Sequence, residues 1–163
     1  MTMRRLHGEK PQPLDWVMVA NAARARCFER DPENGALREI AGFVHPASRQ
    51  KGSELEHDRG GMARKSGAST QFAPHTGAHE KQLDLFAREL ATHLDEAALA
   101  HRFGQLVVVA STPFAGHLRA ALGASARRLA ALVPLDLSSF RGAELEGRVT
   151  QALQEAGSVQ PAA

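Results

Sequence analysis

The chain has 163 residues, of which 43% are hydrophobic and 23% charged, and its formal net charge is +2. These proportions fit one ordinary globular domain, and they exclude a disordered chain and a chain that binds nucleic acid through net charge alone. With Cys27 as its one cysteine, the chain holds no internal disulfide, which favours a reducing compartment. We expect a soluble cytoplasmic protein, because no apolar run resembles a signal peptide or approaches the ~18 residues of a membrane span.

Three short strands are predicted in the first part of the chain. Trp16 to Ala20 is apolar, and Leu37 to Val44 alternates loosely between apolar and polar residues. Between them, Arg24 to Arg30 alternates more cleanly, with Ala25 and Cys27 expected on one side and Arg24, Arg26 and Phe28 on the other. Asn34-Gly35 is a strong turn signal, because both residue types accept a left-handed backbone. Short links between successive strands predict an antiparallel meander.

A long polar stretch from His45 to Gly77 follows and is predicted to be a loop. It has five glycines and little apolar content, and it is locally basic. Its basic residues and central glycines are Lys51, Arg59, Gly60, Gly61, Arg64 and Lys65. Loops of this length inside a compact domain are uncommon and are usually functional or disordered. The glycines would let the backbone approach a phosphate that the basic side chains neutralise, whereas the alternative is a solvated surface loop.

Residues Ala78 to His101 are predicted to form the longest helix, with Thr76 as its cap. Its apolar residues recur at the 3.6-residue period of a helix that buries one face. They are Leu83, Phe86, Ala87, Leu90, Leu94, Ala97 and Ala98.

The centre of the fold is predicted to be a strand, a helix and a second parallel strand. Leu106 to Ala110 is an apolar run rich in valine, as in a strand buried on both faces. Thr112 is expected to cap the next helix, with Pro113 at its first position and Gly123 ending it in the left-handed conformation. Leu129 to Val133 is the second strand. The backbone donors at Ser111 and Thr112 form a candidate anion site, since helix N-termini attract anions.

A final helix is predicted after Ser138 or Ser139, with an apolar stripe of Leu145, Val149, Ala152 and Leu153. The whole pattern predicts a single α/β domain over residues 14–156, between flexible tails at 1–13 and 157–163. Its sheet is expected to hold about five strands, an antiparallel meander followed by parallel strands, with helices packed over it. Ligand sites in such sheets lie at the carboxyl ends of the parallel strands, where Ser111, Thr112 and Asp136 are expected.

An ordered set of segments between residues 14 and 153 carries a family resemblance. The segments are Trp16–Glu29, Phe43–Pro46, Lys51–Leu55, Asp58–Gly60, Pro74, His79–Leu90, Leu106–Ala110, Leu118–Leu122 and Val133–Leu137. No single segment is specific, but together and in this order they resemble a bacterial family described as required for attachment to host cells. That description names a phenotype rather than a molecular activity.

This family is similar to the middle domain of archaeal and eukaryotic class I peptide-release factors, which implies an RNase H-like α/β fold. In release factors, a Gly-Gly-Gln in a long loop promotes hydrolysis of peptidyl-tRNA. The present chain carries Gly60-Gly61-Met62, and methionine has no amide to supply. Asn21 stands where the family carries an acid after the first strand, and Leu135 stands where it carries a lysine.

Three functions are therefore open. The first is an RNA- or ribosome-binding module that contacts tRNA or the ribosome through the long loop and a basic face of Arg24, Arg26 and Arg59. The second is a peptidyl-tRNA hydrolase in ribosome rescue, which Met62 disfavours. The third is a protein-interaction factor that affects attachment indirectly. We expect no cofactor, and whether the protein is an enzyme stays open.

Other candidate sites have simpler structural explanations. Four histidines are metal-ligand candidates, but their spacing favours solvated or capping roles; they are His45, His57, His75 and His79. Ser111, Thr112, His117 and Asp136 suggest a nucleophile with its base, but no Gly-x-Ser-x-Gly turn surrounds Ser111. A metal nuclease would need clustered carboxylates, which Asn21, Glu29 and Asp136 do not provide. We therefore expect no metal.

Overall fold

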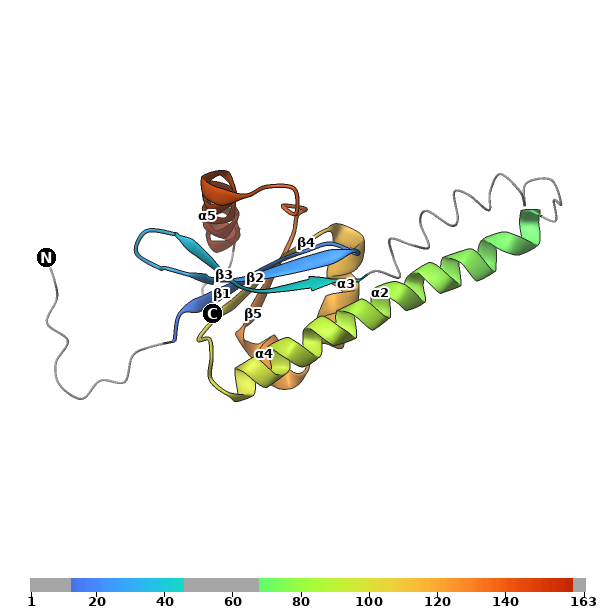
Figure 1. Ribbon diagram of the computed structural model, residues 1–163, viewed down its shortest axis with the longest axis horizontal. Coiled ribbons are helices and arrows are strands. Elements are labelled where there is room, and N and C mark those ends of the chain that lie inside the picture. Colours follow the sequence, from blue (N-terminus) through green and yellow to red (C-terminus); the bar gives the residue numbers. More distant parts are fainter. Residues whose placement is uncertain (1–12, 46–67, 160–163) are drawn as a thin grey trace, which may run out of the picture.

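The computed structural model describes residues 13–45 and 68–159, with side chains placed from residue 77 in the second range (Figure 1). Its five strands form one sheet in the order β3-β2-β1-β4-β5. The strands are β1 (Asp15–Ala20), β2 (Arg24–Arg30), β3 (Leu37–Val44), β4 (Leu106–Ala110) and β5 (Ala130–Pro134). β1 and β3 pair antiparallel with β2, whereas β4 pairs parallel with β1 and β5. The predicted mixed α/β sheet is thus confirmed, and its RNase H-like character stays a prediction.

The turn between β2 and β3 forms where Asn34-Gly35 predicted it. Gly35 has a φ of 73°, in the left-handed region that glycine enters without a steric penalty. Its N–H donates to the carbonyl of Asp31 at 2.8 Å, and the Asp31 N–H donates to the carbonyl of Ala36 at 2.9 Å. These bonds close the hairpin and fix the register of the meander.

Helices cover both faces of the sheet and make a three-layer domain (Figure 1). On one face, α2 (Ala68–Leu99), α3 (Thr112–Ala121) and α4 (Ala124–Leu129) pack against side chains such as Met18 and Val108. On the other face, α5 (Gly142–Val159) packs against Val17, Val109 and Phe28. The continuous apolar run of β4 is buried throughout because it faces helices on both sides. The expected apolar stripes of α2 and α5 face these two cores.

The long helix α2 begins at Ala68, so residues 68–77, predicted as loop, are helical. The polar composition of this stretch favoured a loop, but composition and helix propensity are weak guides to where a helix starts. Thr76, the predicted cap, lies within the helix instead. The first turns of α2 run out beyond the sheet in Figure 1, while its later turns lie across it. The helix ends at Leu99, close to the predicted end at His101, which has a left-handed φ of 55°.

The corner after α3 differs from the prediction. Gly123 is not left-handed, since its φ is −76°; instead it precedes the short helix α4, which the sequence pattern did not predict. A side chain at Gly123 would meet Asp95, because an added Cβ would lie 2.8 Å from the Asp95 Oδ2 atom. The glycine N–H donates to both carboxylate oxygens of Asp95 at 3.0 and 3.1 Å. The small size of Gly123 therefore lets Asp95 approach its N–H group closely, and its torsion angles need no glycine.

Two predicted helix caps are also wrong. Ser111, not Thr112, is the N-cap of α3, and its side chain makes no capping hydrogen bond. Thr112 is instead the first helical residue, and Pro113 follows it. Helix α5 begins at Gly142, several residues beyond the predicted caps, because Ser138 is buried in a different hydrogen-bond network and Ser139 lies outside the helix.

Cys27 lies in β2, a strand paired on both edges, and its side chain is fully buried. It faces the α2 side of the sheet together with Ala25, as the alternation of β2 predicted. Burial raises the pKa of the Cys27 thiol to about 12, so the thiol stays protonated at neutral pH.

Candidate functional site

The carboxyl ends of the parallel strands are held together by Asn21, which directly follows β1. Its Oδ1 atom accepts hydrogen bonds from the backbone N–H groups of Ala23 and Arg24, both at 2.9 Å. Its Nδ2 atom donates to Ser138 Oγ at 2.9 Å. The side chain therefore shapes the β1–β2 turn and also ties that turn to the segment after β5, across 117 residues of sequence.

Asp136 and Ser138 form the second half of this network. Ser138 is 7% exposed, and both its hydroxyl and its backbone N–H donate to Asp136 Oδ1, the latter at 3.0 Å. The Asp136 carboxylate thus holds the turn after β5 in place. Asp136 lies at the predicted edge of the sheet, but these hydrogen bonds give its carboxylate a structural role.

Arg24 and Arg26, predicted to bind RNA, lie over the same segment. Arg24 Nη2 donates to the Ser138 carbonyl at 3.0 Å, and Arg26 Nη2 reaches the carbonyls of Ser138 and Phe140 at 3.3 and 2.8 Å. Burial lowers the pKa of Arg26, and the nearby carboxylate of Glu39 opposes this. Each guanidinium uses one of its three nitrogens in these bonds, so the two arginines fasten the fold and retain further donors.

Ser111 and Thr112, the predicted anion site, lie at the start of α3 beside this network. The Ser111 N–H donates to the Ala20 carbonyl at 3.3 Å, and the Ser111 carbonyl accepts from Ala115 N–H at 2.8 Å. Thr112 is exposed. The first turn of α3 carries no acidic side chain. The position therefore suits an anion electrostatically, and whether it binds one stays a prediction.

The hydrolytic arrangement that Ser111, His117 and Asp136 suggested is not assembled. His117 Nδ1 lies 2.6 Å from Asp84 Oδ1, and His117 Nε2 lies 2.8 Å from Glu80 Oε2. Both ring nitrogens are thus engaged by carboxylates of α2. His117 links α3 to α2 and is not placed to take a proton from a serine at the sheet edge.

The predicted loop residues lie outside the described part of the chain. They are Lys51, Arg59, Gly60, Gly61, Arg64 and Lys65, together with Met62 and His57. Of the candidate metal ligands, His45 Nε2 pairs with Gln82 Oε1 at 2.8 Å, and the His45 ring stacks on Phe86. Within residues 13–45 and 77–157, no group of three or more His, Cys, Asp or Glu side chains is arranged to hold a metal ion.

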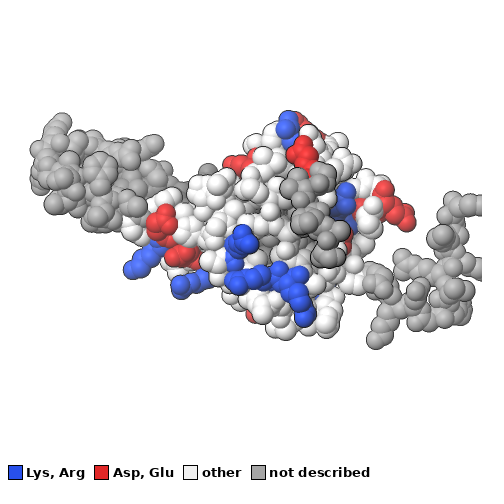
Figure 2. All heavy atoms as spheres, turned by 180° about the vertical axis from the view of Figure 1, so that it is seen from behind, with Lys and Arg blue, Asp and Glu red and all other residues white. Residues whose placement is uncertain are grey.

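A second group of arginines, which was not predicted from the sequence, lies at the ends of α3 and α4. Arg119 ends α3, and Arg127 and Arg128 end α4; all three side chains are exposed. Arg127 Nη2 donates to the carbonyls of Leu122 and Arg119 at 2.8 and 3.1 Å, which caps α3 and fixes this guanidinium. Figure 2 views the molecule from behind and shows Lys and Arg side chains gathering into a patch on that face. The adjacent pair Arg127-Arg128 was the sequence signal for it.

Comparison with protein families assigns the chain. A family described as "Protein required for attachment to host cells" matches residues 16–149, most of the chain. The chain belongs to this host-attachment family. The match covers the sheet from Trp16 onward and ends within α5, so it includes most of the α/β domain. No match to a curated protein was found.

The family assignment predicted from the ordered segments is therefore confirmed, while the relation to release-factor middle domains stays a prediction. Of the helices that the structure describes in this host-attachment protein, none combines the length and apolar character needed to cross a bilayer. The family description names a phenotype and not a molecular activity. The activity therefore has to be inferred from the surface of the protein.

Proposed function

We propose that this host-attachment family protein is an RNA-binding module, and that its ligand is tRNA or ribosomal RNA. The observation that carries the proposal is the exposed patch of Arg119, Arg127 and Arg128, here called the arginine patch. Phosphate oxygens accept charge-assisted hydrogen bonds from guanidinium groups, and such interactions supply most of the sequence-independent affinity for nucleic acid.

Arg127 is suited to contact a phosphate because its guanidinium is held in place. Its three carbonyl contacts fix the guanidinium at the α3–α4 corner, so little side-chain entropy is lost when it binds. None of the ion pairs among the described residues includes Arg119, Arg127 or Arg128.

Two further groups extend the proposed interface. Arg24 and Arg26 keep guanidinium donors beyond those that bind the Ser138 and Phe140 carbonyls. The predicted loop adds Lys51, Arg59, Arg64 and Lys65, and Gly60-Gly61 would let its backbone approach a phosphate. We treat these as separate surfaces, since each is tested by its own variants.

The test is binding of the purified protein to bulk tRNA and to ribosomes across a salt series. We expect affinity to fall steeply with salt, because each phosphate that an arginine neutralises adds ~0.7–0.9 to the log–log slope. The double variant Arg119→Gln/Arg128→Gln should therefore reduce this slope by about 1.4–1.8. Arg127 is left intact because it also caps α3. The matched control is Arg148→Gln on α5, since Arg148 packs over Phe140 and pairs with Glu144.

An unchanged slope in the double variant would remove the arginine patch from the proposal, and a reduced slope in Arg24→Gln or Lys51→Ala/Lys65→Ala would place the interface on those surfaces instead. Absence of binding at low salt to both tRNA and ribosomes would reject the RNA proposal and leave a protein partner as the function to pursue. The hydrolase alternative gains nothing from Ser111, His117 and Asp136, because His117 pairs with Glu80 and Asp84, and Asp136 accepts from the buried Ser138 hydroxyl.

A further inference from the structure

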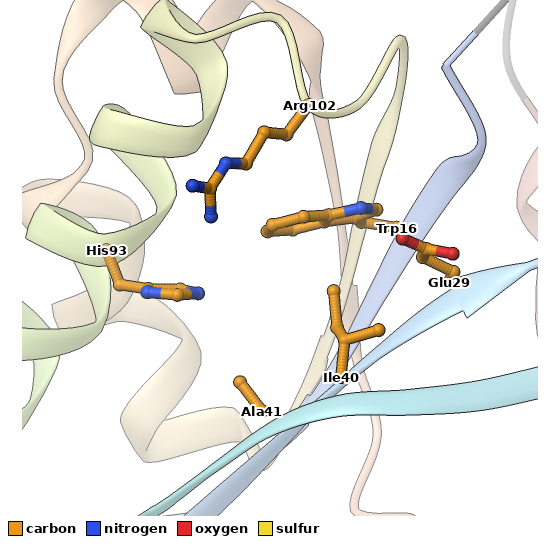
Figure 3. A pocket seen from close by; sticks show the side chains of 6 residues that line it. All are labelled: Trp16, Glu29, Ile40, Ala41, His93 and Arg102. Atoms are coloured by element: carbon orange, nitrogen blue, oxygen red, sulfur yellow. The ribbon is translucent and has the colours of Figure 1, made fainter.

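A cavity of about 340 Å³ lies at the opposite end of the sheet from Asn21, where the parallel strands begin. Figure 3 shows the side chains around it: β1, β2 and β3 form one wall, and α2 with the segment after it forms the other. The lining residues are Trp16, Glu29, Ile40, Ala41, His93 and Arg102. Its volume falls within the range of small-molecule sites. None of its lining residues belongs to the arginine patch.

Two buried polar atoms of the cavity wall have no hydrogen-bond partner among the described residues, Trp16 Nε1 and His93 Nε2. Trp16 is only 3% exposed, so its N–H is removed from bulk water while still unsatisfied. Nearly all buried donors in native proteins find a partner, and an indole N–H can only donate. The indole N–H therefore still requires an acceptor, which none of the described residues supplies.

The cavity also holds a positive charge without an ion-pair partner. Glu29 pairs with Arg38, whereas Arg102 makes no ion pair with any described residue. Burial, followed by the charge of Arg102, lowers the pKa of His93, so its imidazole is neutral at pH 7. Arg102 is thus the free cation here, and the species that best complements it is an anion.

The remaining walls suit a flat apolar group. The Trp16 and His93 rings are nearly parallel, with centroids 6.0 Å apart and planes at 21°, and Phe103 supports the indole from 5.0 Å. Ile40 and Ala41 face the same space from β3 (Figure 3). An aromatic ring would be held between the indole and these aliphatic side chains.

We propose that this cavity binds a small aromatic carboxylate, with its carboxylate on the Arg102 guanidinium and its ring against Trp16, Ile40 and Ala41. The guanidinium donors match the oxygens of a carboxylate, and the indole face and the aliphatic side chains pack against the ring. Water filling the cavity is the competing explanation for the unpaired atoms.

The chain supplies its own reporter, because Trp16 is its one tryptophan. Full-length protein is titrated with benzoate, with its neutral analogue benzamide and with its cationic analogue benzylamine, while Trp16 fluorescence and the heat of binding are followed. We expect benzoate to change Trp16 emission and to bind at least tenfold more tightly than either analogue, because only benzoate pairs with Arg102.

Two variants separate charge from shape. Arg102→Gln keeps the fold, since Arg102 is exposed and makes no ion pair with the described residues, and should weaken benzoate at least tenfold and leave benzamide unchanged. Ala41→Met fills the cavity without altering any charge, and should weaken the binding of all three ligands. Arg148→Gln, on α5, is the matched control and should leave the binding of all three ligands unchanged. Equal binding of benzoate and benzamide, no effect of Arg102→Gln, or no response of Trp16 would each overturn the proposal in favour of a water-filled cavity. Phosphate that binds as tightly as benzoate would likewise contradict the proposal that the ligand is aromatic.

Discussion

The two ends of the sheet treat their polar groups in opposite ways. At the carboxyl end, Asn21, Asp136 and Ser138 bind one another and the backbone around them. At the amino end, Trp16 Nε1 and His93 Nε2 are equally removed from water but have no described partner. The general rule for open α/β sheets places ligands at the carboxyl end. In this molecule that end is closed by its own hydrogen bonds, and the unsatisfied groups lie at the other.

This difference gives a way to distinguish structural from ligand-binding polar groups. A structural network loses stability when a member is replaced by an apolar residue, because the partners left behind are unsatisfied. A group that already lacks a partner loses nothing of that kind, and its replacement removes a desolvation cost. The two ends should therefore respond to polar-to-apolar substitution with opposite signs.

The largest expected effect is that of Asn21→Ala. It removes three hydrogen bonds, leaving two backbone N–H groups without their acceptor and Ser138 Oγ without one of its two partners, so we expect a loss of about 2–3 kcal/mol in the free energy of unfolding. Urea denaturation measures it. Thr92→Ala, which removes one exposed bond to the Arg88 carbonyl, is the control and should change stability by less than about 0.5 kcal/mol. A similar loss of stability in Asn21→Ala and Thr92→Ala would show that the Asn21 network contributes no more than an exposed hydrogen bond.

Arg26→Ala should have a smaller effect at the same end. It removes the hydrogen bonds to the Ser138 and Phe140 carbonyls and the stacking on Phe28, for a loss of about 1–2 kcal/mol by urea denaturation. The exposed Arg24, with one such hydrogen bond, should cost about 0.5 kcal/mol when replaced by alanine. A cost of Arg24→Ala as large as that of Arg26→Ala would show that burial does not set the difference.

The change in the free energy of unfolding should be smallest for His93→Leu, and opposite in sign to the changes above. Leucine fills similar space without the unpaired Nε2 atom, so we expect a gain of about 0.5–1 kcal/mol in the free energy of unfolding at pH 7. A loss of stability would mean that Nε2 has a partner in solution, such as bound water, and the two ends would no longer differ.

The same variant should change the pH dependence. Burial lowers the pKa of His93 below its ordinary 6.5, so below pH 6.5 the unfolded chain binds more protons than the folded protein. The free energy of unfolding of the wild type therefore decreases as the pH falls through 6.5, and the decrease should be shallower in His93→Leu. Denaturation curves at pH 5, 6 and 7 test this, and parallel profiles would contradict it.

Local patterns were sufficient to predict most of the fold. The valine-rich run from Leu106 to Ala110 and the Asn34-Gly35 turn depend on neighbouring residues alone, and both formed as expected. Helix α4 was missed because its six residues are too few to show a helical period. Gly123 was misassigned because a left-handed cap and a close approach to Asp95 demand the same residue, and only tertiary structure separates them.

The sites were harder to predict, since their members are far apart in sequence. Asn21 and Ser138 meet across 117 residues, and nothing local marks either as the partner of the other. Trp16, His93 and Arg102 come from a strand, a helix and a connecting segment, so the cavity leaves no pattern in the chain. The predicted basic residues at 24 and 26 are where the alternation of β2 placed them, but their hydrogen bonds to carbonyls depend on the path of the chain after β5.

The deeply buried Cys27 makes this chain convenient for labelling chemistry. Its thiol is the only one present, is fully enclosed in a strand paired on both edges, and with a pKa of about 12 forms almost no thiolate at neutral pH. A maleimide or a disulfide reagent can therefore reach it only when β2 separates from its neighbours. A cysteine introduced at an exposed site would be modified selectively in the native protein. The slow rate at which Cys27 itself is modified would report how often the sheet opens.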